Sequence, residues 1–70
     1  MNRLEQLRRE RGMSREALAR AAATTRVSIY RYEAGIRTPD LYAAQRLAKA
    51  LGCSLDELVA DPEDSVAETG

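Results

Sequence analysis

The segment RVSIYRYE, residues 26–33, combines residue types that could recognise a nucleic acid. At about 100° per residue of a helix, Ile29 and Tyr32 point to one side, and four side chains crowd the other side. Those four are Arg26, Val27, Tyr30 and Arg31. Guanidinium groups bind guanine edges or phosphates and a valine surface fits a thymine methyl, so this outward face suits a DNA major groove. The alternative is a solvated basic face, because outward faces of surface helices are usually charged.

Other kinds of chemistry have little support in the sequence. The chain has no histidine, and Cys53 is its only cysteine, so one chain forms neither an internal disulfide nor a tetrahedral zinc site. The folded segment offers no pair of carboxylates placed to act as acid and base. We therefore expect no enzyme, no catalytic residue, no metal and no cofactor. Cys53 is expected to behave as a small hydrophobe, with redox sensing as the weaker alternative.

The length and the charge distribution bound the domain. Seventy residues leave room for one domain of ordinary globular composition. Eleven basic and eleven acidic residues cancel, but four of the acidic ones lie in the last ten residues, so residues 1–60 carry a net charge of +4. We expect a basic DNA-binding domain over residues 1–60. Residues 61–70, DPEDSVAETG, should be a flexible acidic tail, since they have too few apolar groups to offset the entropy of ordering.

The sequence shows no membrane or export signal. No apolar run approaches the roughly 20 residues that cross a bilayer. The N-terminal segment MNRLEQLRRERG separates its leucines with arginines, whereas a signal peptide has a continuous apolar centre. The lone thiol fits a reducing compartment, so we expect a cytoplasmic protein with no membrane partner.

Start and stop residues divide the chain into five short helices. Three residues that favour N-caps precede the second, third and fourth helices: Ser14, Thr25 and Asp40. Three glycines stand where the first, third and fourth helices should end: Gly12, Gly35 and Gly52. Residues 54–57, SLDE, have capping-box spacing ahead of a fifth helix of about two turns.

The apolar residues of these segments recur at helical spacing, and no strand pattern competes. The expected core face comprises Leu4 and Leu7 in the first helix, Ala17, Leu18, Ala21 and Ala22 in the second, and Leu41, Ala44, Leu47, Ala48 and Leu51 in the fourth. Met13 should pack beneath the turn at Gly12. The pattern predicts an all-α domain.

The order of elements is a capped helix, a break of three to four residues, and a short helix with a basic outward face. With this order, the chain resembles the lambda-repressor-like, Cro/XRE-type helix-turn-helix family from about Leu4 to Val59. The motifs that carry the resemblance are RGMSREALA, VSIYRYEAG, TPDL and LAKALGCSLDELV. Each motif is weak alone, but together in this order they are specific.

The resemblance implies a compact five-helix domain of a transcriptional regulator that binds double-stranded DNA sequence-specifically. The residues implied to read bases are Arg26, Val27, Tyr30 and Arg31, and those expected to contact phosphate are Ser14, Arg15, Thr25 and Arg37. Glu33 is implied to be a structural glutamate paired with Arg8. Ala23 stands where the family usually has glycine, so either the turn differs or Ala23 takes the left-handed conformation.

The resemblance also implies a homodimer with two third helices in successive major grooves, about 34 Å apart. The dimer surface most compatible with the sequence is the C-terminal part of the fourth helix together with the fifth helix, through Leu55 and Val59. The alternative function is a protein-interaction module of the same fold, such as an antitoxin or an adaptor, with the acidic tail docking on a basic partner.

Overall fold

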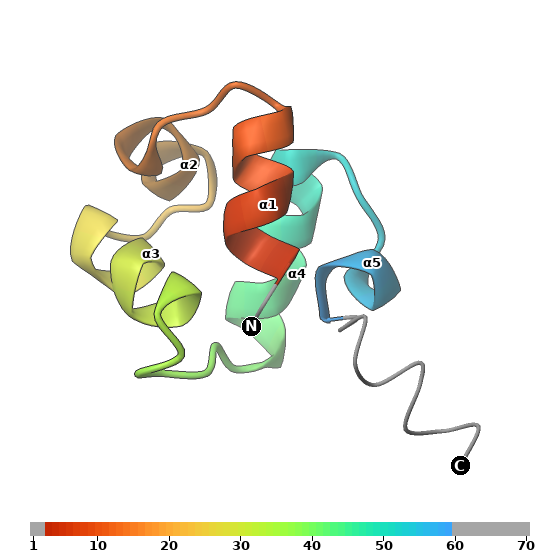
Figure 1. The fold of residues 1–70 in the computed structure, drawn as a ribbon. Coiled ribbons are helices and arrows are strands. Elements are labelled where there is room, and N and C mark those ends of the chain that lie inside the picture. The colour runs from red at the N-terminus through yellow and green to blue at the C-terminus, as the bar shows by residue number, and fades with distance from the viewer. Residues whose placement is uncertain (1–2, 60–70) are drawn as a thin grey trace, which may run out of the picture.

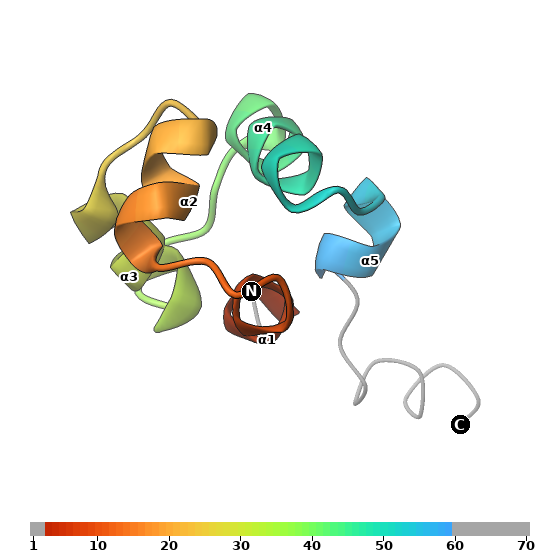
Figure 2. The same cartoon turned by 90° about the horizontal axis from the view of Figure 1, so that it is seen from above.

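The computed structural model describes residues 3–59, and the tail expected over residues 61–70 lies outside that range. Its five helices are α1 (Arg3–Glu10), α2 (Arg15–Ala21), α3 (Arg26–Glu33), α4 (Leu41–Leu51) and α5 (Leu55–Val59). The α2–α3 pair lies on one side of α1, and α5 lies on the other (Figures 1 and 2). α4 packs against both α2 and α5. The all-α five-helix fold is confirmed.

The three expected N-caps are formed by side-chain oxygens that accept a backbone N–H from the first turn of each helix. Ser14 Oγ accepts from Ala17 at 3.0 Å and Thr25 Oγ1 accepts from Ser28 at 3.1 Å. Asp40 Oδ1 accepts from Ala43 at 2.8 Å. The glycines at positions 12, 35 and 52 all have the positive φ expected at helix ends. The helix boundaries therefore follow from local sequence.

α5 starts with the expected capping box. The Ser54 N–H donates to Glu57 Oε1 and the Glu57 N–H donates to Ser54 Oγ, each at 3.0 Å. The hydrogen bond from the Ser54 backbone is the main reason why the pKa of Glu57 is lowered, and that from the Ser54 side chain adds to it. A lowered carboxyl pKa stabilises the fold above the ordinary pKa of glutamate, and this contribution is lost as the pH falls and Glu57 is protonated.

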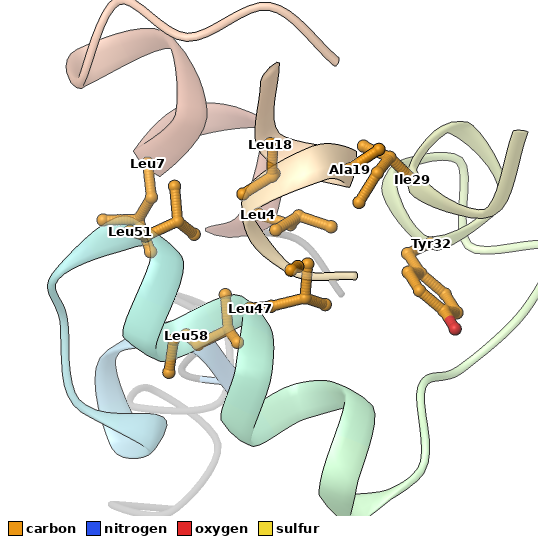
Figure 3. Packing of buried hydrophobic residues seen from close by; sticks show 11 residues of the cluster. Leu4, Leu7, Leu18, Ala19, Ile29, Tyr32, Leu47, Leu51 and Leu58 are labelled. Carbon is orange, nitrogen blue, oxygen red and sulfur yellow. The ribbon is translucent and has the colours of Figure 1, made fainter. Parts of the chain in front are cut away.

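The core is built from leucine, isoleucine and alanine contributed by all five helices (Figure 3). Its largest fully buried side chains are Leu4, Leu7, Leu18, Ile29, Leu47, Leu51 and Leu58. Tyr32 is buried in the same cluster, and Met13 packs against it as expected. The two buried side chains of α3 hold that helix against the rest of the domain.

Two expected core positions are wrong. Leu41 has the phase of the buried stripe of α4 but is 58% exposed, because it lies in the first turn, beyond the side chains that cover the rest of the stripe. Ala21 is exposed, and Ala19 is buried in its place. α2 packs against both α3 and α4, so its buried face is set by two neighbours and is rotated from the expected one.

The turn between α2 and α3 contains a strained residue. Ala23 has a φ of 56°, so of the two alternatives it takes the left-handed conformation. The turn is held by the Thr24 N–H, which donates to Ala19 O at 2.8 Å, and by Arg46 Nε of α4, which donates to Ala22 O at 3.0 Å. A left-handed alanine costs about 1–2 kcal/mol, which these contacts offset.

Glu33 joins the first and third helices through a buried ion pair. Its side chain is only 3% exposed, and Arg8 Nε donates to Glu33 Oε2 at 2.6 Å. Arg8 Nη1 also donates to the carbonyl oxygen of Met13 at 2.9 Å. The pair expected from the resemblance is confirmed, and it ties the end of α3 to the last turn of α1.

Replacing Glu33 with glutamine should lower the free energy of unfolding by about 3–5 kcal/mol, since it strands the buried guanidinium of Arg8. Urea denaturation measures the loss. Glu5→Gln is the matched control, because the Arg9–Glu5 pair has a similar distance, 2.7 Å, but is exposed. It should cost less than about 1 kcal/mol. Equal small losses for both variants would show that the Glu33 pair does not support the fold.

Ala23→Gly should raise the free energy of unfolding by up to about 1 kcal/mol, because glycine takes a positive φ without the side-chain penalty. The same substitution at Ala17, inside α2, should lower it by about 0.5–1 kcal/mol. Thermal denaturation of the two variants measures the change in the free energy of unfolding. The same alanine-to-glycine substitution should raise it at position 23 and lower it at position 17. A lower free energy of unfolding for Ala23→Gly would show that the alanine is not strained at this turn.

Candidate nucleic-acid interface

The outward face of α3 is arranged as the sequence predicts. Ile29 and Tyr32 are buried, whereas Val27 and Tyr30 are 55% and 49% exposed. Arg26 and Arg31 are exposed on the same helix. An exposed valine and tyrosine flanked by two arginines offer both apolar contact and hydrogen-bond donors to a base edge. α3 therefore presents a mixed apolar and cationic surface on an anchored helix.

Arg15 of α2 joins this surface. Its guanidinium carbon lies 5.6 Å from the centre of the Tyr30 ring, within the range of a cation–π contact. Its Nε donates to Glu33 Oε1 at 2.9 Å. That hydrogen bond and the charge of Glu33 raise the pKa of Arg15. Glu33 thus fixes the direction of an arginine beside the outward face.

The structure brings four of the expected residues around one depression. A half-open hollow of about 200 Å³ is lined by Arg15, Arg26, Val27 and Tyr30. We call it the α3 hollow. Arg31 lies on the same helix but does not line it. The outward face therefore combines a hollow lined by two arginines, a valine and a tyrosine with a separate arginine, Arg31, one turn beyond Val27.

The remaining expected phosphate contacts lie at the ends of helices. Ser14 and Thr25 are the N-caps of α2 and α3, and Thr25 Oγ1 also donates to Ser28 Oγ at 3.0 Å. Arg37 is exposed in the loop after α3. Its backbone N–H donates to Arg31 O at 3.2 Å, which keeps Arg37 beside the end of α3. These residues border the outward face without lining the α3 hollow.

Arg20 and Thr24 are not among the residues that the sequence predicts for the interface. They line a second depression of about 260 Å³ with Glu16, Ala19 and Arg26. Arg26 therefore stands between the two depressions. Arg20 of α2 meets Thr24 and Arg26 across the left-handed turn at Ala23, and the spacing of residues within a helix carries no information about such a turn. The carboxylate of Glu16 reduces the positive charge there.

The two residues expected in a dimer surface differ in their exposure to solvent. Val59 is 51% exposed, but Leu55 is half-buried and packs against the core. Leu47 and Leu51, in the C-terminal part of α4, are buried too. Large exposed apolar side chains occur instead at Ile36, before α4, and at Leu41 and Tyr42 in its first turn. Any apolar contact made by α4 must therefore use its N-terminal end.

Other sites can be described only for residues 3–59. Within that range no three histidine, cysteine, aspartate or glutamate side chains gather as a metal site, and no helix is long and apolar enough to cross a membrane. Cys53 is half-buried against the core. Burial raises the pKa of its thiol, which disfavours the reactive thiolate and agrees with a packing role.

Comparison with known proteins agrees with this geometry. Residues 4–58 match the family described as Helix-turn-helix. The chain is 31% identical over 67 residues to the cryptic phage CTXphi transcriptional repressor RstR of Vibrio cholerae. The alignment covers 96% of this chain and 60% of that relative. By its sequence and by its capped α2, tight turn and exposed α3, the chain belongs to the helix-turn-helix family, whose domains bind DNA and are not enzymes.

Proposed function

We propose that the protein is a sequence-specific transcriptional regulator, or the DNA-binding domain of one, that reads the major groove of double-stranded DNA with α3. The observation that carries this function is the outward face of α3, where exposed apolar and cationic side chains stand on a helix anchored by Ile29 and Tyr32. Its similarity to a protein named as a transcriptional repressor supports regulation by repression. Its site of action is the cytoplasm, because its lone thiol fits a reducing compartment.

The proposed base contacts come from α3, and the proposed phosphate contacts come mainly from residues around it. Arg26, Val27, Tyr30 and Arg31 face outward and reach base edges when α3 lies in the groove. Residues at the borders of this face grip the backbone of the DNA: Ser14, Arg15, Thr25 and Arg37. Phosphate contacts set the register of the protein on the duplex, and base contacts select the sequence.

Selection of bound sites from a random pool of duplex DNA tests the proposed function. We expect enrichment of a site with two half-sites whose centres are about one helical turn, 10–10.5 base pairs, apart. Affinity for the selected site should fall steeply with salt, because bound phosphates release counterions. The absence of any enriched site, with binding to a protein partner instead, would favour the alternative of an antitoxin or adaptor.

A two-fold dimer would place two copies of α3 in successive grooves. We propose that the dimer contact uses the first turn of α4 and the end of α5, through Leu41 and Val59. Both side chains are more than half exposed, and the two helices pack against each other within one chain. Leu55 supports this surface from beneath, because it packs against the core.

Arg31→Ala should weaken binding to the selected site by about 1–3 kcal/mol and relax the preference at one base per half-site, because a guanidinium reads guanine O6 and N7. Arg37→Ala should weaken all sequences about equally and reduce the salt dependence by roughly one phosphate contact per subunit. Repeating the selection with each variant measures the base preference, and titrations of the selected duplex at several salt concentrations measure the affinity and its salt dependence. A uniform loss for Arg31→Ala would remove Arg31 from the base-reading residues.

Leu41→Asp should weaken self-association while leaving the fold intact, because an acidic residue in the first turn of a helix is favourable and Leu41 is exposed. Sedimentation measures the dimer, and thermal denaturation checks the fold. We expect the variant to occupy two half-sites with lower cooperativity than the unchanged chain. Identical association of the two proteins would show that the contact lies elsewhere.

A further inference from the structure

The depression beside the turn between α2 and α3 is lined mainly by groups that bind anions. We call this depression of about 260 Å³ the turn depression, and its lining residues are Glu16, Ala19, Arg20, Thr24 and Arg26. The two arginines present guanidinium forks that match the oxygens of a phosphate group. The backbone N–H of Thr24 already donates to Ala19 O at 2.8 Å, so its hydroxyl is the donor left for a ligand. The depression therefore offers three side chains that can donate to one anion.

The simplest alternative is that Glu16 occupies Arg20. A glutamate four residues before an arginine on a helix is well placed for an ion pair. The structure does not form this pair, since the ion pairs within residues 3–59 involve neither Arg20 nor Arg26. Both arginines are exposed, and two guanidinium groups against one carboxylate leave the depression with one net positive charge. The cations are therefore available to a ligand from outside the domain.

This single net charge distinguishes between kinds of phosphate. Each phosphodiester of a DNA strand carries one negative charge, whereas a phosphate monoester carries about 1.5 to 2 at neutral pH. A diester balances the charge of the depression, but the carboxylate of Glu16 repels the additional charge of a monoester or of free phosphate. Arg26 also lines the α3 hollow, so an anion in the turn depression lies beside the surface that enters the major groove.

We propose that the turn depression binds one phosphodiester of the DNA backbone, with Arg20 and Thr24 as its main contacts. This inference rests on the proposed function and extends the interface to the C-terminal end of α2, where no contact was assigned. It also gives Glu16 a role, because the carboxylate restricts the depression to a singly charged phosphate.

Substitution with methylphosphonate tests the contact, because it replaces one charged phosphate oxygen with a methyl group. Each backbone position of the selected duplex is substituted in turn, and affinity is measured by fluorescence anisotropy at constant salt. At one position per half-site we expect the unchanged chain to lose about tenfold in affinity, the effect of one hydrogen bond to a charged group, and Arg20→Gln to lose much less. Lys49→Gln is the matched control and should keep the full loss, since Lys49 is exposed on α4 and does not line the depression.

The salt dependence of binding gives a second readout. Arg20→Gln should reduce it by roughly one phosphate contact per subunit, whereas Lys49→Gln should leave it unchanged. Glu16→Gln should bind all duplexes more tightly, because it removes the carboxylate that opposes the phosphate. An unchanged or lower affinity of Glu16→Gln would contradict the role of that carboxylate.

Inorganic phosphate without DNA separates the two sources of the anion. It should change the melting temperatures of the unchanged chain and of Arg20→Gln equally, since only an ion bound at the depression would distinguish them. A larger rise for the unchanged chain would assign the depression to a free anion and overturn the inference.

The outcomes of the methylphosphonate series separate this inference from the proposed function. If every substituted position affects the unchanged chain and Arg20→Gln equally, the inference is overturned and the proposed function stands. If no duplex is bound selectively, the proposed function fails, and the inference fails with it.

Discussion

The carboxylate of Glu33 is the interaction on which the arrangement of the first three helices depends. It is almost completely buried, and it accepts hydrogen bonds from Arg8 of α1 and from Arg15 of α2. A carboxylate in that position is costly unless both oxygens are paired with donors. The two arginines satisfy this requirement only when three helices have come together. The ion pairs therefore fix one arrangement of these helices, with the burial of leucine as the main stabilising term.

The same carboxylate connects stability with recognition. Arg15 approaches Glu33 through Nε and lies beside the exposed ring of Tyr30. A group buried in the fold thereby sets the direction of a cationic side chain on the surface. Polar residues that support a binding surface from beneath commonly matter as much as those that touch the ligand. In this domain one residue has both tasks, because seventy residues leave few places for a separate support.

Several arginines serve the fold and are not part of the proposed interface. Arg11 Nε donates to Leu51 O at 2.8 Å, and Arg46 Nε donates to Ala22 O. Each guanidinium satisfies a carbonyl at the C-terminal end of a helix, where cations are favourable. The contact from Arg46 also holds the turn that contains the left-handed Ala23. The positive charge that faces a nucleic acid is therefore concentrated on fewer side chains than the composition suggests.

Local sequence specifies the features that depend on neighbours a few residues apart. The N-caps at Ser14, Thr25 and Asp40, the capping box at Ser54 and the two faces of α3 are local, so they could be predicted from residue type and spacing. The Arg8–Glu33 pair could be predicted only from the resemblance to a known family. Whether the tail folds and where a dimer forms stay predictions.

Tertiary packing sets which helix covers which face. It placed Arg15 on Glu33 and Arg46 on the turn, and it rotated the buried side of α2 because two neighbours cover that helix. It also left Leu41 exposed, although its spacing predicts burial, and set Leu55 against the core, although its apolar character predicts a place in a dimer surface. Helical periodicity gives the direction of a side chain around the axis of its own helix. Its burial depends on which neighbouring helices pack over it, and that arrangement is set only in three dimensions.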